Sequence, residues 1–386
     1  MLIEIHMIQN HSPANLNRDD LGAPKTCIFG GVTRARISSQ CLKRSIRRSP
    51  EFAAALEKDG GVRTRRLITE IAKAATDNGG EPNDEDLNKV RDAFKKGGVG
   101  LKENDENTSA ILFFLPQSAV KEMGEAVRIN KGNLGEEFAK IIKKFVKTPD
   151  IALCGRMTEF DAQGSFKELK GKFTVEAALS AAHAISTHAV VNEVDYFVAA
   201  DDIPGQDAGA GHVNEAMYNS ACFYKHFSID WEQLVKNLNN DAELARKTVE
   251  CFIEAAAKAH PSGKQHAFAA FNPPDGVLVE VKVESKTPIS YANAFADPVP
   301  QESERRLIGE SIARLGQYAH ELIDGYEIEA QRFWFSPCNR YSLQYISKDD
   351  KKEHKVTDNE FGKFGEFVEQ VMNQVNATSK PQVVAQ

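Results

Sequence analysis

The segment from Leu21 to Pro50 combines seven basic residues with no acidic one, in a chain of 386 residues whose formal net charge is -7. The seven are Lys25, Arg34, Arg36, Lys43, Arg44, Arg47 and Arg48. A block of one sign on a chain of the opposite sign indicates a binding site for an anion, and a phosphate backbone is the first candidate. The acidity of the whole chain argues against indiscriminate coating of nucleic acid, so any binding must be local.

Four of these cations are spaced to share one face of a short helix. Ser38 or Ser39 can cap the helix start, and the helix should end near Pro50. Leu42 and Ile46, four residues apart, would face inward, opposite Lys43, Arg44, Arg47 and Arg48. A helix N-terminus offers free N–H groups to a phosphate, and the strand-like residues 33–37 before it add Arg34 and Arg36. The pattern predicts a phosphate track, with a merely solvated face as the alternative.

Asp19 and Asp20 stand at the edge of this segment and have the most enzyme-like chemistry in the chain. Adjacent carboxylates can hold a divalent cation that activates water. The same pair also suits an Asx-turn with solvated charges, and that interpretation is favoured.

The other candidates for metal or nucleotide chemistry are weaker. His183 and His188 lie five apart, so they do not share a helix face and are interpreted as packing or capping residues. The six cysteines are scattered without a CxxC pair, which is typical of reduced thiols. Gly30-Gly31 belongs to no P-loop or dinucleotide fingerprint, so it favours a turn or a close backbone approach. We expect no metal and no cofactor.

The elements around these residues follow from hydrophobic periodicity. Strands are predicted over residues 2–8, 33–37, 151–154, 220–229, 267–271, 277–283, 332–335 and 341–346. Helices are predicted over residues 40–48, 53–58, 65–76, 85–95, 109–128, 136–147, 175–187, 241–260 and 302–323. A glycine-rich loop is predicted over residues 193–214. This order favours an α+β sheet with helices on one face, interrupted by a large helical lobe.

Residues 2–8 alternate apolar and polar side chains, as a half-buried strand does, and do not resemble a signal peptide. No apolar run approaches the roughly 20 residues that are needed to cross a bilayer. We therefore expect a cytoplasmic protein with no membrane partner.

Several blocks of the sequence closely resemble the CasC family, the repeated backbone subunit of the type I-E CRISPR surveillance complex Cascade. One block is Arg36-Ile37-Ser38-Ser39-Gln40-Cys41-Leu42-Lys43-Arg44, at the basic segment. The others cover residues 16–20, 28–31, 150–157, 182–188 and 269–273. The match runs in order from about residue 2 to residue 297 and fades after about residue 300.

The resemblance implies an RRM-like (ferredoxin-like) palm with a large helical finger insertion and a thumb loop. The implied parts are a first part of the palm with the basic strand and helix (1–58), the finger (59–173), a palm helix (174–190), the thumb (191–219) and the palm completion (220–375). Residues 376–386 are expected to be a disordered tail.

The resemblance also implies a function without catalysis. Copies of such proteins assemble along a CRISPR RNA, together with other Cascade subunits, and leave segments of the guide free to pair with target DNA. The palm contacts that carry over to this chain are Arg18, Lys25, Ser38, Gln40, Lys43, Arg44 and Arg47. Met157 matches the apolar residue that wedges against a base, and Tyr196 and Phe197 occupy the thumb. The stretch 205–212 matches less closely.

Two other functions stay open. Related CRISPR backbone subunits cut RNA with a loop aspartate before the basic helix, so a metal-dependent ribonuclease using Asp19 and Asp20 is the alternative. A generic RRM protein that stacks bases on sheet aromatics is a weaker one, because the RNP consensus is missing.

Overall fold

A computed structural model describes residues 1–55, 61–76, 80–144, 148–157, 162–170, 174–198, 213–300 and 305–379. The chain divides into two compact units. The first unit is Met1–Ser49, Ala181–Ile229 and Phe252–Gln386, and the second is Pro50–Ser180 and Asp230–Cys251. Both strands and helices build the chain, so the expected α+β class is confirmed. No helix in the described residues is long and apolar enough to span a membrane.

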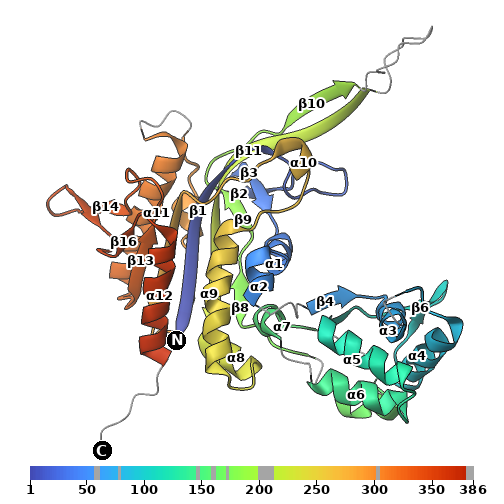
Figure 1. Cartoon of the computed structure of the whole chain (residues 1–386). Helices are drawn as coiled ribbons and strands as arrows, with labels where there is room; N and C mark the ends of the chain where they lie inside the picture. The colour runs from blue at the N-terminus through green and yellow to red at the C-terminus, as the bar shows by residue number, and fades with distance from the viewer. Residues whose placement is uncertain are drawn as a thin grey trace, which may run out of the picture. The chain divides into compact units, whose positions relative to one another are not determined.

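A ten-stranded sheet in the described residues organises the first unit (Figure 1). Its order is β16-β13-β12-β1-β11-β9-β3-β2, and β8 and β10 also pair with β11. The strands are β1 (Leu2–Ala14), β2 (Thr26–Phe29), β3 (Val32–Ile37), β8 (Leu179–Ala181), β9 (Ala184–Ser186), β10 (Glu193–Val198), β11 (Val213–Asp230), β12 (Gly276–Lys282), β13 (Gln331–Phe335) and β16 (Glu360–Phe361). A smaller ribbon joins β14 (Gln344–Ile346) to β15 (Glu353–Lys355).

The first strand is buried on both faces, so the prediction of a half-buried strand over residues 2–8 is wrong. Glu4 and His6 are as inaccessible to solvent as Ile3 and Ile5. The polar positions of β1 are buried because they meet polar partners on neighbouring strands. Glu4 lies directly opposite Glu280 of β12, for example.

Helices cover both faces of this sheet, which corrects the expectation of helices on one face only. On one face, Ile312 and Leu315 of α11 (Arg306–Gly325) join Ile8, Leu278 and Trp334 in a single core. On the other face, Phe252 of α9 (Ala242–Lys258) meets Phe227, and Phe367 of α12 (Phe364–Ser379) meets Phe335. A strand with two buried faces needs such cover on each side.

The second unit has its own core. Phe94 lies at its centre, in ring contact with Phe113, Phe138 and Phe166. The helices of this unit are α2 (Pro50–Ala55), α3 (Leu67–Ala75), α4 (Asp84–Lys96), α5 (Gln117–Arg128), α6 (Leu134–Lys144), α7 (Pro149–Cys154) and α8 (Trp231–Asn237), with a 3-10 turn at Gly164–Leu169. Two short ribbons join β4 (Gly61–Thr64) to β7 (Phe113–Pro116) and β5 (Leu101–Lys102) to β6 (Asp105–Ser109). The predicted helical character of this region is confirmed.

Several predicted elements are of the wrong type, because contacts distant in sequence decide them. The helix predicted over residues 175–187 is instead β8 and β9, held by pairing with β11 and β3. The predicted strand over residues 151–154 belongs to α7, which Pro149 opens at its first turn. Residues 265–268 form the short helix α10 (Gln265–Phe268) rather than a strand.

Three boundaries also move. The helix predicted over residues 109–128 begins only at Gln117, because Phe113–Pro116 pairs with β4. Residues 193–198 of the predicted loop are β10, which pairs with β11. Residues 376–379, expected in a disordered tail, continue α12, where Val375 and Val371 are buried. Residues 380–386 lie outside the described residues.

Candidate nucleic-acid interface

The basic helix α1 (Ser39–Arg47) starts where the sequence predicts it. The Ser38 hydroxyl accepts a hydrogen bond from the Cys41 N–H at 3.3 Å and so caps the helix. The Ser38 N–H donates to Asn17 Oδ1 at 2.9 Å, which ties the helix start to the preceding loop. Leu42 and Ile46 are buried, as predicted. The helix is therefore fixed at its start and along its apolar face, and its other face carries the charges.

That charged face is positive along its whole length. Gln40, Arg44 and Arg48 are exposed, and Lys43 and Arg47 are half-buried. Arg44 and Arg47 lie in the last turn, where cations also complement the helix dipole, so helix stability accounts for part of their presence. The first turn has no acidic residue to neutralise the positive end of that dipole. The whole face therefore favours an anion.

An open pocket of about 530 Å³ adjoins α1 within the first unit. It lies between the loop before β2, α1 and the residues that precede α10. Its lining residues are Leu16, Asn17, Arg18, Asp19, Asp20, Gly22, Cys41, Arg44, Ser45, Ser262 and Gly263. Gly263 approaches the loop so closely that a Cβ there would collide with the Leu16 carbonyl oxygen. The pocket thus brings Arg18 together with Arg44, two of the sequence-predicted site residues.

The Asp19 carboxylate in this pocket organises a turn. Its Oδ1 accepts hydrogen bonds from the N–H groups of Leu21 and Ala23, each at 2.9 Å. The Asx-turn interpretation is confirmed for Asp19. Asp20 is exposed beside it, and the described residues that line the pocket include no histidine and no third acid. A two-carboxylate site with one oxygen committed to the turn is a poor cradle for a divalent cation.

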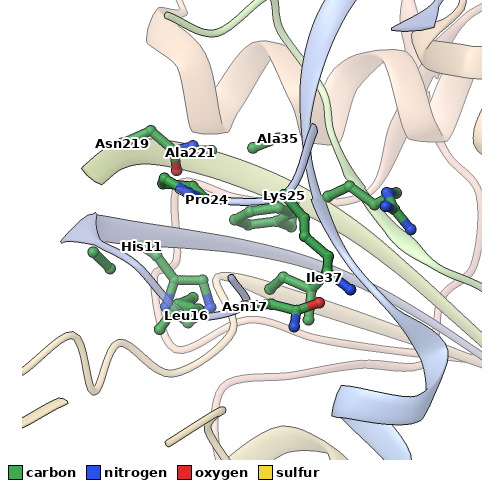
Figure 2. A pocket seen from close by; sticks show the side chains of 12 residues that line it. His11, Leu16, Asn17, Pro24, Lys25, Ala35, Ile37, Asn219 and Ala221 are labelled. Atoms are coloured by element: carbon green, nitrogen blue, oxygen red, sulfur yellow. The ribbon is translucent and has the colours of Figure 1, made fainter. Parts of the chain in front are cut away.

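Lys25 lies at the end of the loop that precedes β2 and contains Asp19. Its N–H donates to the Asn17 carbonyl oxygen at 2.8 Å, and its side chain is half-buried. Figure 2 shows Lys25 with His11, Asn17 and Asn219 around a cavity of about 10 Å³. That volume is about what one water molecule needs. Lys25 is therefore close to the start of α1, because Asn17 contacts both.

Arg34 does not belong to the track, which corrects the sequence-based prediction. The side chain is completely buried, and its guanidinium donates to four backbone carbonyls. Nε donates to Phe29 at 3.2 Å, Nη1 to Ser186 at 3.0 Å, and Nη2 to Phe295 and Ala296 at 2.8 and 3.2 Å. Arg34 joins three segments of the fold, and its charge is used inside the protein.

Gly30 and Arg36 lie close to Arg34 in the sequence. The predicted close approach of the backbone at Gly30 is confirmed. Gly30, at φ +60°, lets the β2–β3 turn approach the chain closely, because a Cβ would overlap the Ala296 carbonyl oxygen. Arg36 is half-buried, and its Nη1 lies 3.0 Å from His183 Nδ1. Burial, followed by the charges of Arg36 and Lys25, lowers the pKa of His183. The potential beside the track is therefore positive.

The remaining predicted residues lie elsewhere. Met157 belongs to the second unit and is 85% exposed after the end of α7. Tyr196 and Phe197 lie on β10, 68% and 47% exposed. They face Glu215 and Asn214 of β11 in the antiparallel register, so their side chains point to opposite faces of the hairpin. Residues 205–212 are outside the described residues.

A possible metal cluster in the described residues is not at this interface. Buried Glu4, His6 and His226 bring one ligand atom each within 4.8 Å of one another. The Lys282 ammonium, also buried, already donates to the Glu4 carboxylate. A divalent cation would meet that positive charge, so the cluster fits an ion-pair network better than a metal centre. His188, also considered from the sequence, packs internally and accepts the Cys222 N–H at 3.3 Å.

The sequence also belongs to a known family. The model of the CT1975-like proteins matches residues 3–361. The chain belongs to the CT1975-like family. The resemblance to CasC proteins is thereby confirmed, and it extends through β13 and α11, beyond the point near residue 300 where the sequence blocks fade.

Solved structures agree with this membership. This CT1975-like protein is similar to a chain of a "CRISPR RNA-guided surveillance complex, pre-nicking", with a TM-score of 0.81 and 29% identity, over 97% of this chain and 100% of that one. A chain of another "CRISPR RNA-guided surveillance complex" has a TM-score of 0.70 at 24% identity, over 97% and 100% of the two chains, and shows the likeness of fold. A search of curated proteins returned no match.

Proposed function

We propose that this protein is the CRISPR RNA-binding backbone subunit of a type I-E Cascade complex. The observation that supports this proposal most directly is the face of α1, which carries several cations and no acidic residue. It adjoins the pocket lined by Arg18 and Arg44, in a chain of the CT1975-like family. The first unit acts as the RRM-like palm, the second as the finger, and the β10–β11 hairpin as the base of the thumb. Copies assemble side by side on one guide RNA, together with other Cascade subunits.

The chemistry of the face suits this task. Lys and Arg contacts to phosphates position a nucleic acid without reading its sequence. Recognition of target DNA is then left to base pairing by the guide, which the protein needs only to hold and display. Ser38 and Gln40 add neutral donors at the start of α1. No covalent step and no cofactor are required of the protein.

Salt dependence of RNA binding tests the proposal. Lys43→Glu with Arg44→Glu should weaken binding to every RNA sequence. The slope of log K against log salt should flatten by about 0.7 for each phosphate that the variant no longer neutralises. The matched control is Lys348→Glu with Lys352→Glu, which makes the same charge change at exposed positions between β14 and β15. An unchanged slope in the α1 variant, or an equal effect of the control, would contradict the track.

The second candidate is a metal-dependent ribonuclease that uses Asp19 and Asp20: the Asp20 carboxylate is exposed at the pocket, but Asp19 Oδ1 is committed to the turn, so the metal site would be weak. It is separated from the first by incubating the assembled protein with guide, complementary RNA and Mg²⁺. We expect intact RNA. Cleavage at regular intervals that Asp20→Ala abolishes would establish the nuclease instead.

A further inference from the structure

Phe271 is an aromatic residue that the first unit displays to solvent. It follows α10 in the chain, and its side chain is 60% exposed. The exposed aromatic side chains of the described residues also include Tyr196 and Phe197 of the hairpin and Tyr326 after α11. A single exposed ring is ordinary in a folded protein, so its surroundings decide whether it has a role.

Contacts on both sides of Phe271 fix its position. Its ring meets the ring of His260 nearly at a right angle, with 5.8 Å between the centroids. The carbonyl oxygen of the next residue, Asn272, lies 2.9 Å from His260 Nε2 and accepts a hydrogen bond from Gln9 Nε2 at 2.6 Å. The Oδ1 atom of Asn272 accepts hydrogen bonds from the N–H and the hydroxyl of Ser12 at 3.1 and 3.0 Å. A residue that is fixed before binding loses little conformational freedom when a ligand arrives.

Two residues beside Phe271 adopt a backbone conformation that their side chains disfavour. Lys264 and Ala269 flank α10 in the left-handed region, at φ +46° and +48°. The Phe271 N–H donates to the Ala269 carbonyl oxygen at 2.9 Å, which closes a turn directly before the exposed ring. Non-glycine residues in this region are uncommon, and such strain is found most often at functional sites. The fold therefore maintains the turn at Phe271 against local preference.

The segment that carries Phe271 also borders the proposed RNA site. Ser262 and Gly263, which precede α10, line the 530 Å³ pocket beside α1. His260, which contacts Phe271, also meets His11 edge-on, with 5.9 Å between the ring centroids. His11 lines the small cavity of Figure 2. Phe271 thus lies two ring contacts from a cavity near the start of α1, on a segment that forms part of the pocket wall.

The charges around Phe271 suit a ligand that carries phosphate. Residues 255–274 contain no acidic residue, and this is the longest such stretch in the chain after the one that contains α1. Tyr326 is more exposed, at 74%, but stands between exposed Asp324 and Glu327. Those carboxylates would repel a phosphate from Tyr326, whereas the segment of Phe271 has none.

We propose that Phe271 is a further RNA-binding residue, on whose ring a base of the bound RNA stacks. The inference rests on the proposed function, since the base belongs to the RNA whose phosphates the face of α1 holds. Every base has a π-face, so stacking on Phe271 selects no sequence. The ring contributes a contact to a base, which the phosphate track does not make.

A short oligoadenylate and an abasic ribose-phosphate strand of the same length separate stacking from charge. Phe271→Ala should bind oligoadenylate roughly tenfold more weakly than the wild type, as expected for one base stacked on an aromatic ring, and the abasic strand equally tightly. The matched control, Tyr326→Ala, also removes an exposed ring and should bind both strands normally. Because the Phe271 side chain is exposed, its variant should unfold at the same urea concentration as the wild type.

Phe271→Trp gives a readout that does not depend on a loss of affinity. The two native tryptophans, Trp231 and Trp334, are buried, so the new indole is the exposed fluorophore. Stacking on adenine should quench its emission when oligoadenylate binds, and the abasic strand should leave the emission unchanged. Equal quenching by both strands, or by neither, would overturn the inference.

The outcomes distinguish this inference from the proposed function. If Phe271→Ala binds both strands normally while Lys43→Glu with Arg44→Glu binds both weakly, stacking is wrong and the track stands. If neither variant loses affinity, the proposed function itself fails. If Phe271→Ala binds both strands equally weakly, or shortens only the assemblies on a long guide, the ring contacts the backbone or another copy, and the inference is overturned.

Discussion

Arg34 and Arg44 stand ten residues apart in the same acid-free segment, yet their surroundings give them different roles. The guanidinium of Arg44 is exposed at a pocket wall, where an anion from solution can reach it. The guanidinium of Arg34 is surrounded by carbonyl oxygens of three segments. A hydrogen bond from a charged group to such a buried acceptor is worth about 1.5–3 kcal/mol. One side chain is therefore available for binding, and the other maintains the surface on which binding takes place.

Substituting Arg34 should unfold the protein before it affects RNA contacts. Arg34→Met leaves the carbonyl groups of Phe29, Ser186 and Phe295 buried without their donor, and we expect a loss of about 3–5 kcal/mol in the free energy of unfolding. Urea unfolding followed by circular dichroism measures it. Arg44→Met serves as the comparison and should unfold like the wild type. An Arg34→Met protein of normal stability but weak RNA binding would put Arg34 back into the track.

The sequence predicts best what is decided locally. The start of α1 follows from Ser38 and the spacing of Leu42 and Ile46, and the Asp19 turn follows from a single side chain and its nearest N–H groups. The partners of Arg34 at Phe295 and Ala296 lie about 260 positions away along the chain, so no local pattern distinguishes that arginine from its neighbours.

At the scale of elements, a row of buried charges joins the central strands. Glu4 of β1 lies opposite Glu280 of β12, which lies opposite Arg332 of β13. Arg332 Nε donates to Glu280 Oε1 at 2.7 Å, and Lys282 donates to Glu4. His6 Nε2 lies 3.4 Å from Glu280 Oε2. The carboxylates of Glu4 and Glu280 lie on directly paired residues in the middle of the sheet. The pairing of β1 with β12 therefore depends on the cations that neutralise them, Lys282 and Arg332.

These buried charges make the free energy of unfolding depend on pH in the acid range. Burial alone would raise the pKa of Glu280, but the hydrogen bond and charge of His6 and the charges of Arg332 and Lys282 outweigh it and lower the pKa to about 2. The folded pKa is below the unfolded value of 4.5, so Glu280 stabilises the fold above pH 4.5. This contribution, roughly 3 kcal/mol, is lost as the pH falls from 4.5 towards 2.

Glu280→Gln should flatten the acid limb of the stability curve. Urea midpoints between pH 7 and pH 3 measure the change. The pKa of Glu4 is also lowered, and burial lowers that of His226 below 6.5, so both add losses of the same sign as the pH falls. Some acid sensitivity will remain in the variant. An acid limb identical to that of the wild type would show that Glu280 titrates alike in the folded and unfolded states.

The β10–β11 hairpin is the element from which assembly can be tested. Figure 1 shows β10 with β11 as a ribbon extending from the sheet. Because Tyr196 and Phe197 point to opposite faces of it, they cannot both contact the same neighbouring surface. We expect Tyr196→Ala and Phe197→Ala to remain folded monomers and to differ from each other in assembly on RNA.

Sedimentation of each hairpin variant on a long guide measures the length of the assembly. Val194→Ala, at a less exposed position of the same strand, is the control for the hairpin's own stability. Normal assembly of both aromatic variants would remove the hairpin from the interface between copies.

For the whole molecule, the distribution of charge connects RNA binding with assembly. A copy with net charge -7 repels another copy at low salt, while the α1 face of each attracts phosphate. Copies should therefore associate only when an RNA strand supplies the negative charge that the palms share. Under the proposed function, RNA would act as the template that sets the number of copies.

The mass of the protein with and without RNA decides whether assembly is templated in this way. We expect a monomer of 42.6 kDa in the absence of RNA and, on guides of increasing length, a series of species that grows by one 42.6 kDa copy at regular nucleotide intervals. Native mass spectrometry resolves such steps. Lys43→Glu with Arg44→Glu should leave the monomer intact and abolish the series, because the template is no longer held. Oligomers that form without RNA, or a single bound copy on every length of guide, would contradict templated assembly. The contact between copies would then not depend on RNA held at the basic face of α1.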